Sequence, residues 1–218
     1  MSSIVRPEFG ESLPTKLGPK WRALGRFPRA LIIAAAAAVV VIVVAAPLLG
    51  FGSPTRNVEV AAPVPFQLHY DSDLLQQRLA VGRESLRLES PAGVGAKRSF
   101  VVQPALLPAY KGSIQGVLPL WAEEMTRQMS AGDPSYATVA EAPVLLEKQP
   151  GYEILYRFSR GGRSVYGRRV ILFPVDPGAR AGVDVTMTAV RGEGALTAPA
   201  LAQQPPLREA FESLVVGN

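Results

Sequence analysis

The sequence predicts an α+β fold, in which an antiparallel sheet packs against two main helices as an α/β sandwich, preceded by one transmembrane helix. Three observations lead to this expectation: an uncharged stretch near the N-terminus, several short alternating segments after it, and two segments with helical spacing of apolar residues. At 218 residues the chain has room for one ordinary domain and a short addition.

The uncharged stretch, ALIIAAAAAVVVIVVAAPLL, predicts a membrane-spanning helix over residues 30–50. Twenty helical residues are about 30 Å long, which matches the hydrocarbon core of a bilayer. Only one Lys or Arg, Arg56, occurs in the twenty residues that follow. Four cations precede the stretch closely: Lys20, Arg22, Arg26 and Arg29. This asymmetry predicts a single-pass protein of the cell membrane, with its N-terminus in the cytoplasm and its C-terminal part outside.

A cleaved signal peptide is the main alternative to this retained signal-anchor. Small residues before Ala46 would suit a cleavage site there. However, Pro47 would follow the cut, and both the charged region and the apolar run are longer than in typical signal peptides. These features favour the anchor.

The remaining chain divides by composition into a tail, a linker and one domain. Residues 1–29 form a basic, proline-containing tail expected in the cytoplasm, and residues 51–65 are expected to be an extended linker. Residues 66–218 are expected to form the extracytoplasmic α+β domain. Residues 51–218 hold 17 cations and 16 anions, since six of the 23 cations and two of the 18 anions lie in the first thirty residues. This near-neutral balance argues against a nucleic-acid partner.

Two helices are expected in the domain. Ile114, Leu118 and Trp121 begin an apolar stripe of helical period over residues 114–129, with the regular helix starting near Leu118 because Pro119 suits a first turn. A second amphipathic helix is expected over 206–216.

Alternating residues predict the strands. The candidates before the first helix are 66–70, 85–89 and 99–102, with a short helical turn at 74–79 after the cap residues of Asp71-Ser72-Asp73. The candidates after it are 152–159, 164–173 and 183–190, and a tight Arg160-Gly161-Gly162 turn joins the first two of these. This order predicts an antiparallel meander.

The chain resembles the PsbP-like fold, including LpqN-type lipoproteins and related membrane-anchored proteins. The likeness rests on the helix LPLWAEEMTRQM, the meander from GYEILYRFSRGG to GVDVTMTAV, and the closing helix PPLREAFESLVVG. It covers about residues 66–217. The resemblance implies an α/β sandwich used for protein binding, assembly or accessory roles, and it brings no active-site residues.

Several chemistries are excluded or disfavoured. The chain has no cysteine, which excludes disulfides, thiolate metal sites and a cysteine nucleophile, and it has one histidine, His69. No nucleophile elbow, P-loop or zinc-protease motif is present, although residues 162–167 come near the first of these. His69 is more simply interpreted as a partly buried or surface histidine, and Asp71-x-Asp73 as a turn and helix cap. We therefore expect no cofactor and no metal site.

Basic residues gather around the expected hairpin of the meander. A cluster of this kind protects sheet edges against aggregation or binds an acidic partner or lipid headgroups. The cluster consists of Arg157, Arg160, Arg163, Arg168 and Arg169. If it binds a partner, replacing Arg168 and Arg169 by glutamate should weaken capture without affecting folding.

Together these features predict a membrane-anchored, extracytoplasmic, non-catalytic binding or accessory domain that contacts a protein or envelope component. The bilayer itself would be contacted through residues 30–50. Two alternatives remain: a hydrolase or transferase that uses Asp, Glu or Ser, which needs buried converging carboxylates, and a carrier of small apolar ligands, which needs an apolar cavity between sheet and helix.

Overall fold

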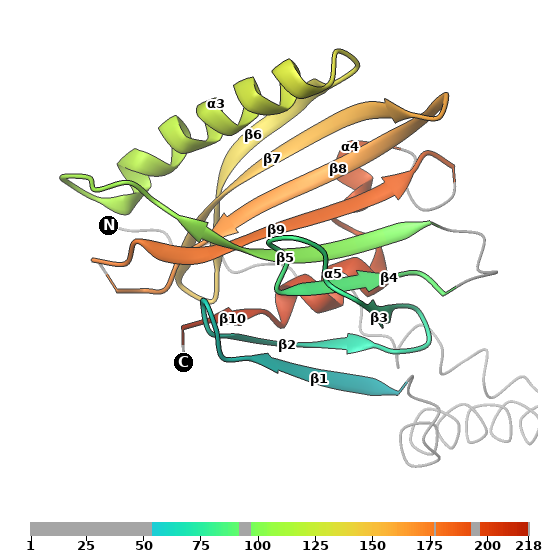
Figure 1. Ribbon diagram of the computed structural model, residues 1–218, viewed down its shortest axis with the longest axis horizontal. Coiled ribbons are helices and arrows are strands. Elements are labelled where there is room, and N and C mark those ends of the chain that lie inside the picture. Colours follow the sequence, from blue (N-terminus) through green and yellow to red (C-terminus); the bar gives the residue numbers. More distant parts are fainter. Residues whose placement is uncertain (1–53, 92–96, 177, 193–196, 218) are drawn as a thin grey trace, which may run out of the picture. The chain divides into compact units, whose positions relative to one another are not determined.

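The structure, a computed structural model, describes residues 54–91, 97–176, 178–192 and 197–217. Within these residues the strands form two antiparallel sheets (Figure 1). The larger sheet contains, from edge to edge, β3 Gln76–Arg78, β4 Leu86–Glu89, β5 Arg98–Leu106, β9 Ala181–Val190, β8 Arg163–Leu172, β7 Gln149–Arg160 and β6 Ala137–Leu146. The smaller sheet contains β1 Thr55–Val60, β2 Phe66–Asp71 and β10 Val215–Val216. The helices are α3 Ile114–Gly132, α4 Ala198–Leu201 and α5 Pro205–Glu212.

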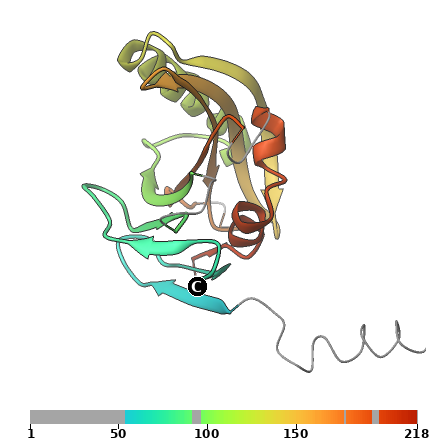
Figure 2. The ribbon, with the colours of Figure 1, turned by 90° about the vertical axis from the view of Figure 1, so that its right-hand side faces the viewer.

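Both faces of the larger sheet are covered, because its central strands carry apolar side chains on alternating sides. On β8, Leu172 belongs to the main core together with Phe211 of α5. Its neighbour Ile171 packs with Leu118 of α3 in a separate cluster. Figure 2 accordingly shows α3 on one side of the sheet and the two C-terminal helices on the other. The α+β class expected from the sequence is confirmed.

The smaller sheet closes the main core. Its central strand, β2, pairs with β1 on one edge and with β10 on the other. The buried side chain of Gln149, the first residue of β7, links this sheet to the larger one: its Nε2 donates to the Val216 carbonyl at 2.8 Å and its Oε1 accepts from the Val216 N–H at 3.3 Å. The two sheets are therefore joined by hydrogen bonds as well as by apolar packing.

Helix α3 confirms the predicted apolar stripe but begins earlier than expected. It starts at Ile114 rather than near Leu118, and Pro119 lies inside it. Pro119 is the sixth residue of the helix and has no backbone N–H, so the helix loses the hydrogen bond to the carbonyl four residues earlier. Burial of Ile114 and Leu118 against the sheet favours the extra turn.

Four segments differ from the sequence prediction. Thr55–Val60, expected in the linker 51–65, forms strand β1, and residues 74–79 contain strand β3 instead of a helical turn. Strand β6 was not predicted. The closing helix ends at Glu212, and the chain turns at Ser213 into strand β10. All four include short or edge strands, whose position in a sheet depends on partners far along the chain.

The predicted transmembrane helix, residues 30–50, and the tail 1–29 lie outside the described residues. In the part of the chain that the structure describes, no helix has the length and apolar character needed to cross a bilayer.

Candidate functional site

The structure does not bring the five predicted arginines together on one surface. Arg168 and Arg169 are neighbours on β8 and so point to opposite faces of the sheet. Arg157, Arg160 and Arg163 are exposed on the β7–β8 hairpin. Only the hairpin arginines are therefore placed to meet a partner, and binding through them stays a prediction.

Arg168 is buried on the face that carries α5. Its Nε donates to Glu153 Oε2 at 2.7 Å, and its guanidinium lies 4.4 Å from the centre of the Phe211 ring. Such a guanidinium holds a strand and a helix together. Against the expectation from the sequence, this burial predicts that changing Arg168 to glutamate disturbs folding as well as any binding.

Arg169 is held in the same way on the face that carries α3. Its Nε lies 2.9 Å from both carboxylate oxygens of Asp184, and Nη2 also donates to this carboxylate. Gln103 donates to the same carboxylate at 2.9 Å, while Nη1 of Arg169 approaches Met129 Sδ at 3.3 Å. Burial lowers the pKa of Arg169, but the hydrogen bonds that Arg169 donates to Asp184, together with the charge of this carboxylate, outweigh burial and raise the pKa overall. Arg169 is thus a structural residue as well.

A basic pocket of about 480 Å³ opens beside the β7–β8 hairpin. Its cations come from separate elements: Arg78 from β3, Lys97 from the segment before β5, and Arg160 from the hairpin. All three are exposed. Its base includes the hydroxyls of Ser99 and Thr188, which lie 2.6 Å apart on paired strands. The pocket therefore combines hydroxyl groups with exposed positive charges.

Two further arginines line this pocket but are already engaged. Arg87 donates from Nε and Nη2 to Glu84 and from Nη1 to Glu89. Arg98 reaches Gln204 with Nη2 at 3.4 Å, and its Nε is buried without a hydrogen-bond partner among the described residues. Burial also lowers the pKa of Arg98. The side chains of Arg87 and Arg98 therefore form walls of the pocket, whereas Arg78, Lys97 and Arg160 are its exposed cations.

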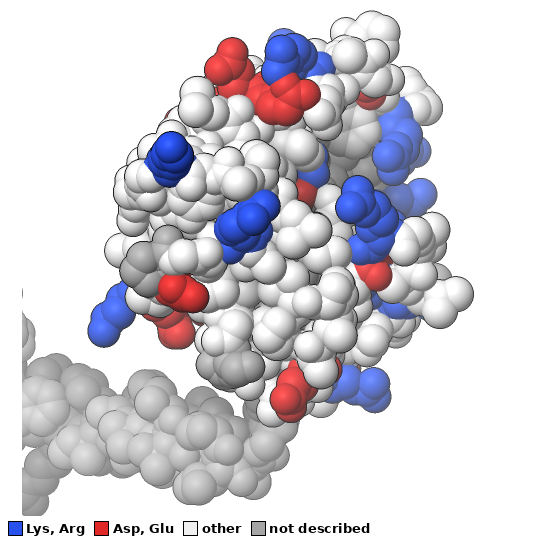
Figure 3. Space-filling model, turned by 60° about the vertical axis from the view of Figure 1, so that its left-hand side comes forward, with Lys and Arg blue, Asp and Glu red and all other residues white. Residues whose placement is uncertain are grey.

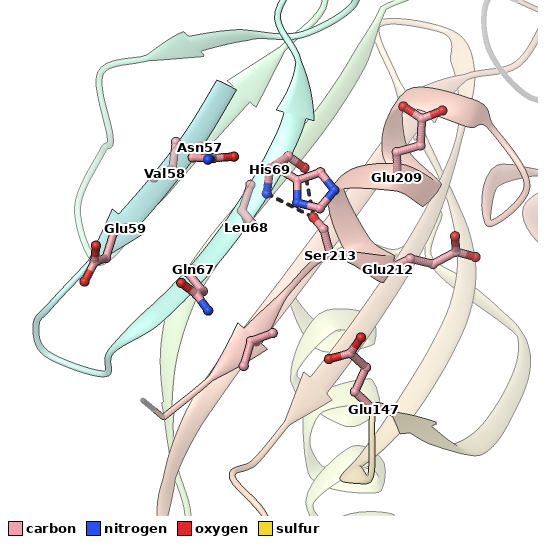
Figure 4. A pocket seen from close by; sticks show the side chains of 11 residues that line it. Asn57, Val58, Glu59, Gln67, Leu68, His69, Glu147, Glu209, Glu212 and Ser213 are labelled. Atoms are coloured by element: carbon pink, nitrogen blue, oxygen red, sulfur yellow. Dashed lines mark hydrogen bonds between the residues drawn. The ribbon is translucent and has the colours of Figure 1, made fainter. Parts of the chain in front are cut away.

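A second groove, of about 740 Å³, lies between the smaller sheet and α5 (Figure 4). His69 lines it, and the groove is otherwise marked by carboxylates: Glu59, Glu147, Glu209 and Glu212. All four carboxylates are exposed. The His69 backbone N–H donates to Ser213 Oγ at 3.0 Å, and this hydroxyl donates to the His69 carbonyl at 2.9 Å. These bonds fix the backbone of β2 against the end of α5, so Ser213 has a structural role.

A third hollow, of about 640 Å³, is mainly apolar. It lies between the first turns of α3 and the β6–β7 turn, and its lining includes Leu118, Pro119, Val144, Leu145 and Tyr152. Figure 3 shows the side of the domain that bears these strand ends as a largely uncharged surface with separate basic and acidic groups. Leu145 is 70% exposed there, so this end could accept an apolar partner.

The acidic residues considered in the sequence have local roles. Asp71 Oδ1 accepts from the backbone N–H groups of Asp73 at 2.8 Å and Leu74 at 3.3 Å, as expected of a turn. Within the described residues, no three His, Asp or Glu side chains gather into a metal-binding group. Glu123 and Glu124 lie on α3, and Glu124 accepts from Gln128 at 2.7 Å.

The sequence analysis missed the basic pocket. Arg78 and Lys97 lie about twenty residues apart, and Arg160 is much farther along the chain. They meet because β3, β4, β5, β9, β8 and β7 pair one after another in the register observed. The only sequence signal was a pair of basic residues, Lys97-Arg98, directly after the glycine-containing turn.

Comparison with known proteins shows that the chain resembles solved structures in its fold. No family model matches the chain, and no curated protein matches it. Among solved structures, LpqN of Mycobacterium tuberculosis, a protein involved in cell envelope biogenesis, has a TM-score of 0.52 at 11% identity and covers 75% of this chain and 92% of its own. The cyanobacterial PsbP of Synechocystis has a TM-score of 0.51 at 9% identity, covering 77% of this chain and 96% of its own. The resemblance expected from the sequence is thereby confirmed for the fold.

Proposed function

We propose that this chain, which has the PsbP-like fold, is a single-pass membrane protein whose domain lies outside the cytoplasm and acts as a non-catalytic binding or accessory module. The uncharged segment 30–50 and the basic residues before it support the anchor and its direction. The likeness to LpqN, a protein involved in cell envelope biogenesis, is compatible with a partner in the envelope.

The observation that carries the binding role is the charged end of the larger sheet. Arg78, Lys97 and Arg160 reach this end from three elements and form no ion pair with another described residue. Exposed cations of this kind attract acidic surfaces over distances of about 8 Å at physiological salt. The end thus suits contact with an acidic protein or an anionic envelope component.

The anchor and its direction are tested on the full chain in membranes. A reporter enzyme that works only outside the cytoplasm, fused after Asn218, should be active, and the chain should resist extraction with alkaline carbonate. Deleting residues 30–50 should abolish both properties. An inactive reporter on a stably produced fusion would contradict the proposed direction, and a mature chain that begins after Ala46 would contradict the anchor.

The binding role is tested by partner capture from membranes that hold the full chain. Exchange of Arg78, Lys97 and Arg160 for glutamate should reduce chemically cross-linked partner at least tenfold, because the charged end would then repel an acidic surface. Exchange of Lys111 and Lys148, two exposed cations elsewhere on the domain, is the control and should leave capture unchanged. Equal loss in both variants would mean that the charged end has no special role.

The apolar hollow favours one second candidate, a carrier of small apolar ligands. Its volume of about 640 Å³ and its place between α3 and the sheet meet the criteria for such a site. Val144→Trp should fill the hollow. If the hollow holds a ligand, each wild-type chain in a nanodisc should bind one more molecule of fluorescent fatty acid than each variant chain. Equal uptake would reject the carrier role.

A further inference from the structure

The base of the basic pocket can donate a hydrogen bond to a ligand. Ser99 Oγ and Thr188 Oγ1 share one hydrogen bond of 2.6 Å, in which either hydroxyl is the donor. Two hydroxyls carry two hydrogens, so one hydrogen is left for another acceptor. Both side chains are only partly buried, and both line the pocket. An anion that enters this pocket therefore meets a donor at its base.

The walls of the pocket favour an anion with an organic part. Arg78, Lys97 and Arg160 supply positive charge from three sides, while Glu84 and Glu89 are engaged by Arg87 and hold it in place. Three apolar residues complete the lining: Pro91, Val165 and Val190. Inorganic phosphate has no carbon atoms to pack against these apolar groups, whereas the CH and CH₂ groups of the glycerol in a phospholipid headgroup can pack there.

The pocket lies on the same side of the domain as the start of the described chain. Pro54 is fixed there, because its carbonyl accepts from the backbone N–H of Ser72 at 2.9 Å and from its hydroxyl at 2.8 Å. Figure 1 shows both the beginning of β1 and the tip of the β7–β8 hairpin on its right-hand side, β1 at the bottom and the hairpin at the top. Only residues 51–53 separate Pro54 from the predicted membrane helix, and three residues span about 10 Å at most.

We propose that the basic pocket binds the phosphate of an anionic phospholipid headgroup in the leaflet from which the predicted membrane helix emerges. The choice of a lipid as the source of the phosphate rests on the proposed function, because a short tether would hold this end of the domain near the headgroups. The free hydrogen of the Ser99–Thr188 pair is donated to a phosphate oxygen, and the three cations attract the negative charge of the lipid. The domain then stands with its charged end on the membrane and its apolar end away from it.

Binding is tested first without a bilayer, so that the result does not depend on the anchor. The full chain in a non-ionic detergent is titrated with dihexanoyl phosphatidylglycerol and separately with inorganic phosphate. The lipid should saturate one site and bind at least tenfold more tightly than phosphate. Arg78→Gln with Arg160→Gln should weaken lipid binding at least tenfold, because each cation near an anionic lipid contributes about fivefold. Lys111→Gln with Lys148→Gln should change it less than twofold.

Two results of this titration would overturn the proposal. Equal lipid binding by the wild-type chain and the Arg78/Arg160 variant would remove the pocket as the site. Phosphate binding as tight as lipid binding would show a site for free phosphate instead. Far-UV circular dichroism of each variant confirms that a loss of binding does not come from unfolding.

Orientation on the membrane is tested with a fluorophore on the full chain, which has no natural cysteine to interfere. Ser164→Cys places the label on the exposed hairpin, and Lys111→Cys places it before α3. In nanodiscs with phosphatidylglycerol, a quencher on lipid headgroups should reduce the first signal and not the second. In nanodiscs of phosphatidylcholine alone, neither should change. Equal quenching at both positions would overturn the docked orientation.

The outcomes separate this inference from the proposed function. A chain that fails the reporter and carbonate tests but still binds phosphatidylglycerol in detergent has the lipid site without the anchor. A chain that is anchored as proposed but shows no saturable lipid binding lacks the site.

Discussion

Asp184 illustrates how strongly one buried side chain can affect the stability of this fold. It is 2% exposed, and its carboxylate accepts from Arg169 and from Gln103. Asp184 and Arg169 are diagonal neighbours on paired strands, since Arg169 lies opposite Thr186. A charge buried this deeply is tolerated only while its partner is present.

We therefore predict that Asp184→Ala lowers the free energy of unfolding by about 3–5 kcal/mol, because it leaves the Arg169 guanidinium buried without its counter-charge. Urea denaturation of the full chain in detergent, followed by circular dichroism, measures this change. The double variant Arg169→Met with Asp184→Leu, which removes both charges, should be more stable than the single variant. A single variant as stable as the wild type would show that solvent reaches the pair.

The sequence did not predict this pair, although it contains both residues in expected strands. Arg169 was grouped with its neighbours as part of one basic cluster. Whether a strand residue is buried depends on which face it occupies and what covers that face. Here α3 covers it, and the position of α3 over β8 depends on long-range packing rather than on local pattern.

At the level of elements, the β7–β8 pair is the best example of sequence and structure agreeing. Both strands and their turn were expected, and Tyr156 lies directly opposite Gly167. A Cβ at position 167 would overlap the Tyr156 ring, so the ring lies flat over the glycine. Burial of this ring raises the pKa of the Tyr156 hydroxyl. Gly167 thus serves packing rather than a nucleophile elbow.

Gly167→Ala should destabilise the domain by about 1–3 kcal/mol, because the added methyl group displaces the Tyr156 ring from a filled core. The matched control is Gly116→Ala in α3, where only Ser113 Oγ comes within 4 Å, at 3.8 Å. That change should stabilise the helix by about 0.5–1 kcal/mol. Thermal unfolding of the two variants gives the comparison, and shifts of the same sign would contradict it.

The elements that the sequence missed share a physical cause. Most side chains of β6 are exposed, so its residues lack the apolar alternation that marks β7 and β9. Strand β10 has two residues, and β1 lies between prolines at 54 and 63. Such strands form because a neighbouring strand offers hydrogen bonds, and a sequence pattern does not report that neighbour.

For the whole molecule, the join between the two sheets depends on Gln149. Its side-chain amide satisfies both the N–H and the carbonyl of Val216 in a buried place. Without the amide these two backbone groups have no partner, and each costs about 1–3 kcal/mol when buried.

Gln149→Ala should accordingly lower the free energy of unfolding by about 2 kcal/mol or more and speed hydrogen exchange at Val216. Gln128→Ala is the control: this exposed glutamine on α3 bonds to Glu124, and its loss should change stability by less than about 0.5 kcal/mol. Exchange at Val216 that stays as slow as in the wild type would show that the smaller sheet closes without this bridge.

The order of the strands also has a consequence for how the protein is made. The smaller sheet needs Phe66 and Gln67 beside Val216 and Val215, which stand near opposite ends of the domain sequence. A chain that leaves a ribosome or a translocation pore from its N-terminus must wait for its last strand, so the domain matures late. Until then the apolar side chains of Phe66 and Leu68 stay open to solvent or to a chaperone.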